Sequence, residues 1–104
     1  DYERWVEEER TSARERAAAA SWAMAVAFEG QSQYTEAGSW ARRAVRHAWT
    51  DERVLRRAMT LLDRLGDRAG AIKLYDEFAR RLRADLEVEP STETTALANS
   101  IRSH

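Results

Sequence analysis

Apolar residues recur along the chain at intervals of three and four, the period of an amphipathic helix, and sustained alternation with a period of two is absent. The pattern predicts an all-α fold of about five helices. Gly30 and Gly66 interrupt it between helices, and Pro90 ends the fourth helix because proline lacks a backbone N–H and clashes with the preceding turn. The predicted helices cover residues 2–29, 33–49, 52–65, 68–85 and 92–102.

Each predicted helix carries an apolar stripe that we expect to face the core. Thr50 and Asp51 can cap the third helix and Ser91 the fifth, because their side chains can accept from the free N–H groups of a first turn. Gly38 falls inside the second helix, where close packing of another helix would favour it. The first stripe is Trp5, Ala13, Ala17, Ala20, Met24 and Phe28; Tyr34 and Leu86 are expected inward on the second and fourth helices.

Two helix pairs in tandem suggest an internal repeat. Ala37 aligns with Ala71 at the separation of one tetratricopeptide repeat, about 34 residues, and the same shift aligns Phe28 with Leu62. A helix hairpin alone buries only part of its apolar surface, and stacking of a second copy covers the rest. The pattern therefore predicts tetratricopeptide-like stacked antiparallel hairpins within a single domain of residues 1–104.

Composition narrows the class of function. The chain of 104 residues has a net charge of −1, so it lacks the basic surplus typical of a domain that binds nucleic acid by itself. Cysteine is absent, which excludes disulfides and thiolate metal sites. No apolar run approaches the roughly 20 residues of a membrane span and no leader peptide is evident, so we expect no membrane partner and a cytoplasmic location.

Three segments in order along the chain carry a family resemblance. They are residues 3–10 (ERWVEEER), residues 66–75 (GDRAGAIKLY) and residues 82–91 (LRADLEVEPS). Together they resemble the bacterial transcriptional activator domain of regulators of the antibiotic-regulatory-protein type. Two departures stand out: Glu87 replaces a usual glycine, and Thr94 and Thr95 replace more typical residues of the closing helix, which is therefore expected to be loosely docked.

The resemblance implies a role in transcription regulation. Such regulators carry a winged helix-turn-helix domain before this module, so DNA would be contacted only through a domain absent from this chain. The start at Asp1 and the absence of an upstream helical segment usual in the family suggest a piece of a longer regulator. The implied partners are proteins: an adjacent domain, a second copy or the transcription machinery.

Two surfaces are candidates for partner binding. Repeat geometry predicts that the first helix of each pair lines a concave groove, where tryptophan and arginine could anchor a peptide; alternatively, upstream or closing helices fill that groove. Arginines on the second and third helices form a candidate basic surface, whose alternative is an ordinary solvated face. The groove residues are Trp22, Val26, Glu29, Arg53, Arg56, Thr60 and Asp63; the basic residues are Arg42, Arg43, Arg46 and Arg57.

No arrangement of residues indicates catalysis. The chain has no glycine-rich phosphate loop and no serine, histidine and aspartate at a suggestive spacing, so we expect neither an enzyme nor a cofactor. Two histidines cannot form a metal site by themselves. The favoured hypothesis is a protein–protein interaction and regulatory domain of a transcriptional activator, and the alternative is a generic tetratricopeptide scaffold that docks a peptide or partner domain.

Overall fold

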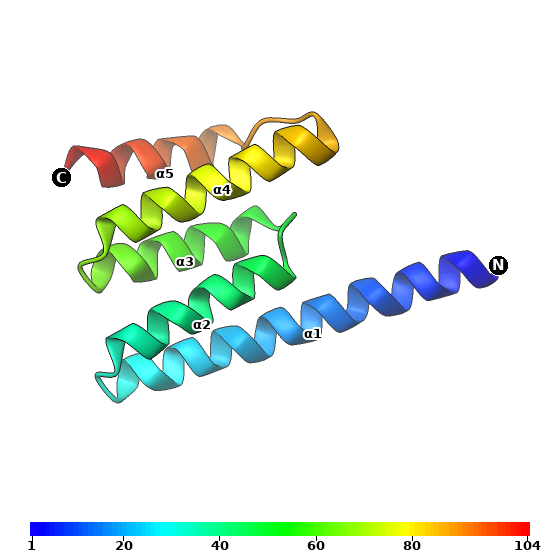
Figure 1. The fold of residues 1–104 in the computed structure, drawn as a ribbon, viewed down its shortest axis with the longest axis horizontal. Helices are drawn as coiled ribbons and strands as arrows, with labels where there is room; N and C mark the ends of the chain where they lie inside the picture. The colour runs from blue at the N-terminus through cyan, green and yellow to red at the C-terminus, as the bar shows by residue number, and fades with distance from the viewer. The chain divides into compact units, whose positions relative to one another are not determined.

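The computed structural model describes all 104 residues and consists of α-helices without strands (Figure 1). The all-α prediction is confirmed, and the predicted helix ends lie close to those observed. The chain forms two compact units, residues 1–48 and residues 49–104. The helices are α1 (Tyr2–Gly30), α2 (Tyr34–His47), α3 (Glu52–Arg64), α4 (Arg68–Leu86) and α5 (Thr92–Ser103).

The first unit is an antiparallel hairpin of α1 and α2 packed through small residues. Gly38 is buried within α2, as expected for a glycine at a packed position inside a helix. Because α1 has 29 residues and α2 has 14, the N-terminal half of α1 extends beyond its partner (Figure 1). The buried residues are Ala18, Ser21 and Ala25 of α1 and Ala37, Gly38, Ala41, Ala44 and Val45 of α2.

The predicted inward face of α1 is wrong. Trp5 is 57% exposed and Met24 39% exposed, and Ala13 and Ala20 are also exposed. α2 instead packs on the opposite face, which contains Ala18. Alanines occur on both sides of α1, so the few large residues dominated the sequence pattern although they are not the residues that α2 covers.

Two further inward predictions are wrong for a common reason. Tyr34 is 51% exposed and Leu86 is 49% exposed. Tyr34 is the first residue of α2 and Leu86 the last residue of α4. The apolar stripe of a helix is covered only where a neighbouring helix continues alongside it. The neighbouring helices do not continue alongside the ends that carry Tyr34 and Leu86.

The second unit has a core of large aliphatic and aromatic side chains. α3 and α4 form its hairpin, and α5 packs against both. Leu55, Met59, Leu61 and Leu62 are almost completely buried, and full burial of such a side chain stabilises the fold by about 1.5–3 kcal/mol. The remaining buried residues are Ala58, Ala71, Leu74, Tyr75, Phe78, Ala79, Leu82, Thr94, Ala98 and Ile101.

The turn from α1 to α2 closes with a Schellman motif. The backbone N–H of Gln33 donates to the carbonyl of Phe28 at 2.9 Å, and that of Ser32 donates to Glu29 at 2.9 Å. Ser32 adopts a left-handed conformation with φ of 59°. A serine in this region has a steric cost that glycine avoids.

The turn from α3 to α4 repeats this geometry one repeat length further along the chain. The N–H of Asp67 donates to the carbonyl of Leu62 at 2.8 Å, and that of Gly66 donates to Asp63 at 3.0 Å. Here the left-handed residue is a glycine, Gly66, with φ of 88°. Corresponding bonds in the two turns are thus separated by the same shift that aligns Ala37 with Ala71, which confirms the tetratricopeptide-like repeat of the helix hairpin.

The residues chosen to detect the repeat also correspond. Ala37 and Ala71 are each the fourth residue of the second helix in their hairpin, and neither is exposed to solvent. A larger side chain at either position would force the helices of its hairpin apart. The alignment drawn from sequence therefore matches equivalent places in the two units.

Candidate functional site

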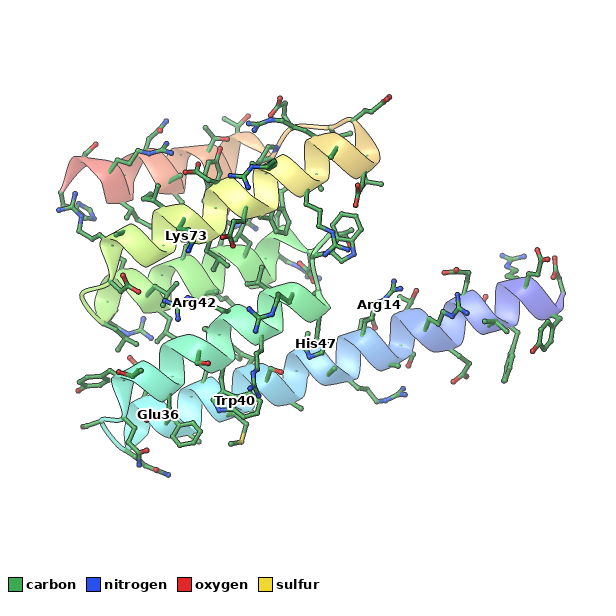
Figure 2. The ribbon with its side chains drawn as sticks, in the orientation of Figure 1. Arg14, Glu36, Trp40, Arg42, His47 and Lys73 are labelled. Carbon is green, nitrogen blue, oxygen red and sulfur yellow. The ribbon has the colours of Figure 1, made fainter.

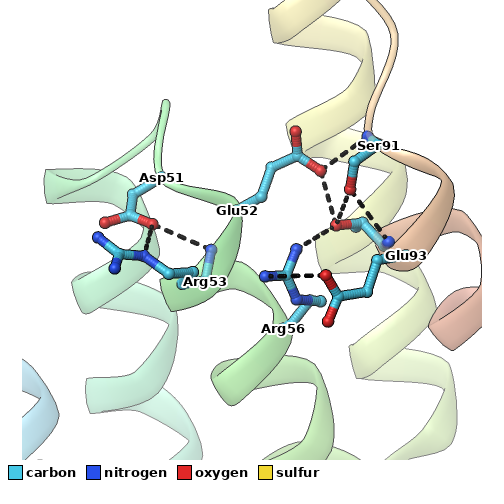
Figure 3. Close-up of polar contacts among 7 residues, drawn as sticks. Asp51, Glu52, Arg53, Arg56, Ser91 and Glu93 are labelled. Atoms are coloured by element: carbon cyan, nitrogen blue, oxygen red, sulfur yellow. Dashed lines mark hydrogen bonds and ion pairs between the residues drawn. The ribbon is translucent and has the colours of Figure 1, made fainter.

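A hydrogen-bond network joins the start of α5 to α3 within the second unit (Figure 3). One carboxylate oxygen of Glu52 accepts from the hydroxyl of Thr94 at 2.6 Å and from the backbone N–H of Ser91 at 2.8 Å. The guanidinium of Arg56 donates to the Thr94 hydroxyl at 2.9 Å and lies 3.6 Å from the carboxylate of Glu93. We call these five residues the Thr94 network.

The centre of the Thr94 network is withdrawn from water. Thr94 has no exposed surface, and its hydroxyl connects a carboxylate to a guanidinium. Burial acts to raise the pKa of Glu52, but the hydrogen bonds from Thr94 and Ser91 and the charge of Arg56 outweigh it, so the pKa lies below its ordinary value. Glu52 therefore holds α5 as a carboxylate.

The other end of α5 is held by charged side chains of α4. Arg68 donates to the backbone carbonyls of Ile101 at 3.1 Å and of Arg102 at 3.0 Å, which satisfies groups that a helix C-terminus leaves free. Arg102 in turn pairs with Asp76 at 3.3 Å. The C-terminal end of α5 is thus fixed by groups that the sequence pattern did not single out.

The expected loose docking of α5 is wrong. Thr94 is buried in its network, and the hydroxyl of Thr95 lies 3.2 Å from that of Tyr75 on α4. The two threonines supply polar links to α3 and α4 where leucines would supply only apolar contact. No buried side-chain nitrogen or oxygen in the structure lacks a hydrogen-bond partner.

The predicted groove residues of α3 are divided between α5 and solvent. Arg56 is half-buried in the Thr94 network, and Asp63 lies 3.6 Å from the imidazole of His104. Arg53 is exposed and pairs with Asp51, the cap of its own helix, at 3.5 Å, while Thr60 is exposed. In this unit the closing helix occupies part of the predicted surface, which is the alternative considered from sequence.

The predicted groove residues of α1 lie near its C-terminal end. Val26 is 52% exposed, and Trp22 and Glu29 are half-buried. The structure brings these three together on one side of α1, since they are spaced by four and three residues. Their role in partner binding remains a prediction.

Comparison with known proteins decides the family. The family model of the bacterial transcriptional activator domain matches residues 1–102. The chain belongs to this family. No curated protein and no solved structure matched it. The resemblance carried by three short segments is therefore confirmed over residues 1–102 of the chain.

One departure from the family pattern has a structural consequence in this activator domain. Glu87, where the family usually has glycine, follows the last residue of α4 and adopts the left-handed conformation with φ of 55°. The loop after it is braced by Arg83, whose guanidinium pairs with Glu89 at 2.6 Å. The left-handed backbone explains why glycine is usual at this position, and Glu87 adopts the same conformation at a steric cost.

The predicted basic residues of the activator domain lie in two separate units. On α2, Arg43 stacks over the ring of Trp40 at 4.4 Å, and Arg46 is exposed. Arg42, on the same helix as Trp40 (Figure 2), is half-buried. Arg57 is exposed on α3. The stack of Arg43 on Trp40 is a contact within α2, and a binding role for the basic residues remains a prediction.

Two features of the activator domain escaped the sequence analysis. Arg81 of α4 stacks over the ring of Trp49 at 4.0 Å, which leaves that tryptophan half-buried. An open groove of about 740 Å³ lies between α4 and the end of α5, with Ile72, Lys73 and Ile101 among its lining residues. Both depend on long-range packing, for which a single sequence carries no direct signal. None of the five helices has the length and hydropathy needed to cross a membrane.

Proposed function

We propose that this activator domain is a protein–protein interaction and regulatory module of a bacterial transcription regulator. The observation that carries the proposal is the exposed apolar surface of α1. Tyr2 is 76% exposed, Trp5 57% and Met24 39%. Tyr2 and Trp5 lie together, with their ring centroids 6.3 Å apart, whereas Met24 lies far along the same helix. Exposed aromatic side chains that lie together mark interaction sites, and in a family of transcriptional activators the natural partners are protein components of regulation.

The mechanism is surface complementarity between helices. The C-terminal half of α1 packs on α2, and the N-terminal half extends beyond it and presents Trp5 on an exposed helix that a partner can bury without disturbing the core. DNA is contacted through a domain of the regulator that this chain does not contain. The module would then link operator occupancy to contact with an adjacent domain, a second copy or the transcription machinery.

The test is deletion of residues 1–104 from the parent regulator. We expect reporter transcription to fall to the level without the regulator, while operator binding in a gel-shift assay stays nearly unchanged. A point variant that leaves the hairpin intact, Trp5→Glu, should reduce activation in the same direction because Trp5 is exposed and lies outside the core. Full activation by the deleted regulator would contradict the proposal.

The alternative, a scaffold that docks a peptide in a concave groove, has less support. Arg56 and Asp63, two of its predicted contacts, are engaged by α5 and the C-terminal residue of the same chain. It predicts that Trp22→Ala weakens one specific partner more than Trp5→Ala does. The interaction proposal through the exposed Tyr2 and Trp5 predicts the reverse order.

A further inference from the structure

Three arginines of the chain stack over aromatic rings. The stack covers the flat face of the guanidinium and leaves the N–H groups at its edge available as hydrogen-bond donors. All three lie within the roughly 6 Å over which an aromatic face attracts a guanidinium. The pairs, with the distance from the guanidinium carbon to the ring centroid, are Arg43–Trp40 at 4.4 Å, Arg81–Trp49 at 4.0 Å and Arg102–Tyr75 at 5.7 Å.

Two of the stacked arginines also pair with a carboxylate of the chain. The Nε of Arg81 lies 3.5 Å from the carboxylate of Asp85, which follows it by four residues in α4. A terminal nitrogen of Arg102 lies 3.3 Å from the carboxylate of Asp76. In both cases one guanidinium combines an aromatic ring on its face with an acidic partner at its edge.

Arg43 has the aromatic ring but no acidic partner. No carboxylate of the chain lies within ion-pair distance of its guanidinium, and the residue four positions after it is His47, not an acid. The only acidic residue of α2 is Glu36, seven positions before Arg43 and thus about two helical turns away. The side chain of Arg43 is exposed, so the stack holds its free N–H groups at the surface.

Further basic side chains lie beside Arg43 on α2. Arg46 and His47 follow it by three and four residues, so they are its neighbours on the helix surface, and both are exposed. Arg46 has no carboxylate partner either. Trp40 is half-buried, and tryptophan and arginine are enriched among the side chains that dominate binding at interfaces. We call Trp40, Arg43, Arg46 and His47 the Arg43 cluster.

We propose that the Arg43 cluster binds an acidic peptide segment of a partner protein. A carboxylate of the partner takes the place at Arg43 that Asp85 holds at Arg81, and a neighbouring acidic side chain of the partner reaches Arg46. Two N–H groups at the edge of a guanidinium match the two oxygens of a carboxylate, so the contact is directional as well as charged. The inference deepens the interaction role proposed above, and rests on it, by naming the chemistry of the partner.

A peptide fits the Arg43 cluster better than a nucleic acid does. Arg43, Arg46 and His47 lie within about one helical turn, roughly 5 Å along the axis of α2. A nucleic acid presents regularly spaced phosphates, and its binding depends on a surplus of positive charge that tracks them. The chain has a net charge of −1 and no such surplus.

Titration of the chain with a hexaglutamate peptide, followed by ¹H–¹⁵N NMR at low ionic strength, tests the assignment. Low salt is needed because salt screens exposed charges. We expect the indole signal of Trp40 and the Nε–H signal of Arg43 to shift in a saturable manner. The corresponding signals of Trp49 and Arg81 should stay in place, because Arg81 already has its carboxylate. Hexaglutamine should shift none of them. An unmoved Arg43 signal, or equal shifts at Arg43 and Arg81, overturns the proposal.

Substitutions separate a specific contact from general attraction between opposite charges. Arg43→Gln should raise the dissociation constant for hexaglutamate about fivefold, the size expected for an exposed ion pair. Arg43→Lys keeps the charge but loses the planar edge, and should raise it about threefold. Arg57→Gln makes the same charge change at an exposed arginine of α3 and should have almost no effect. Circular dichroism should be unchanged in all three variants. Equal weakening by Arg43→Gln and Arg57→Gln overturns the proposal.

A short DNA duplex, titrated in the same way, separates carboxylate from phosphate recognition. We expect the duplex to leave the signals of Trp40 and Arg43 in place. Saturable shifts with the duplex but not with hexaglutamate would assign the Arg43 cluster to nucleic acid and overturn the proposal. The titrations use the chain alone, so their failure is distinct from failure of the broader interaction role, which is decided by activation after deletion of the domain from the regulator.

Discussion

The α1–α2 turn and the α3–α4 turn have the same backbone hydrogen bonds. They differ in the side chain of the left-handed residue and in that of the residue before the second helix. In the first, Ser32 takes the left-handed conformation and Gln33 precedes α2 without a side-chain cap. In the second, Gly66 takes that conformation, and the carboxylate of Asp67 accepts from the backbone N–H of Gly70 at 2.9 Å. The hairpin geometry is therefore retained even where the local sequence favours it less.

The two hairpins also differ in what they bury. The core of the first unit consists mainly of alanine, glycine and one valine, whereas the second buries leucine, methionine, phenylalanine and tyrosine. Alanine removes much less apolar area from water than leucine does. The second unit is thus expected to hold most of the stability of the chain, and the variants below test how far the difference extends.

The largest expected effect comes from truncating equivalent core positions. Leu62, which is 1% exposed, corresponds to Phe28, which is half-buried. Leu62→Ala should lower the free energy of unfolding by about 2–5 kcal/mol through lost burial and a cavity. Phe28→Ala should cost less although it removes a larger side chain, because that side chain is already partly in water. Urea unfolding followed by circular dichroism measures both, and a larger loss for Phe28→Ala would contradict the comparison.

The Thr94 network has no counterpart in the first unit, where Ala18 occupies the position one repeat length before Glu52. Thr94→Val keeps the shape of the side chain but leaves Glu52 and Arg56 without the hydroxyl between them. We expect a loss of about 1–3 kcal/mol. Thr95→Val, which removes one half-buried hydroxyl bond to Tyr75, is the control and should cost less. Equal losses of unfolding free energy in the two variants would mean that burial of Thr94 adds nothing to the contribution of its hydrogen bonds.

The same network predicts an acid sensitivity confined to the second unit. The pKa of Glu52 is lowered in the folded state, so its contribution to stability is present above its unfolded pKa and is lost as pH falls through the lower folded value. Glu52→Gln should flatten the dependence of stability on pH in the acidic range below about pH 4.5. Unfolding curves recorded at several acidic pH values compare the variant with the wild type, and an unchanged slope would contradict the prediction.

Exchange of the helix caps has a smaller expected effect. Asp67→Gln should lower stability by about 1 kcal/mol, because the first turn of α4 loses an acceptor for its free N–H groups. Gln33→Asp should raise stability by a similar or smaller amount, since α2 has no side-chain cap. Thermal unfolding of the two single variants and of the double exchange measures both signs. A destabilising Gln33→Asp would show that the turns differ in more than their cap residue.

The sequence predicted the helices and their ends where neighbouring residues determine them. It did not predict the tertiary contacts between helices. Ser91 caps α5 as predicted, Asp51 is the one of the two predicted residues that caps α3, and the repeat emerged from the spacing of Ala37 and Ala71. The buried face of α1 was not predictable, because alanine lies on several sides of the helix and carries little directional signal. The Thr94 network joins residues 38 to 42 positions apart, and only the folded chain brings them together.

The smallest expected effect tests the left-handed residues of the two turns by reciprocal exchange. Ser32→Gly relieves the steric cost of a Cβ at φ of 59°, but glycine also loses more backbone entropy on folding, so the net gain should be only about 0.5 kcal/mol. Gly66→Ser introduces that cost at φ of 88°, where nothing lies within 4 Å of an added Cβ; strain alone should then destabilise the chain by about 1 kcal/mol. Ser32→Ala retains a Cβ and is the control for loss of the hydroxyl. If Ser32→Gly is neutral while Gly66→Ser is costly, the first turn relieves its strain by local adjustment, as an alanine-rich hairpin with a small core would allow. If both changes are neutral, hairpin packing rather than the turn residue determines this backbone shape in both units.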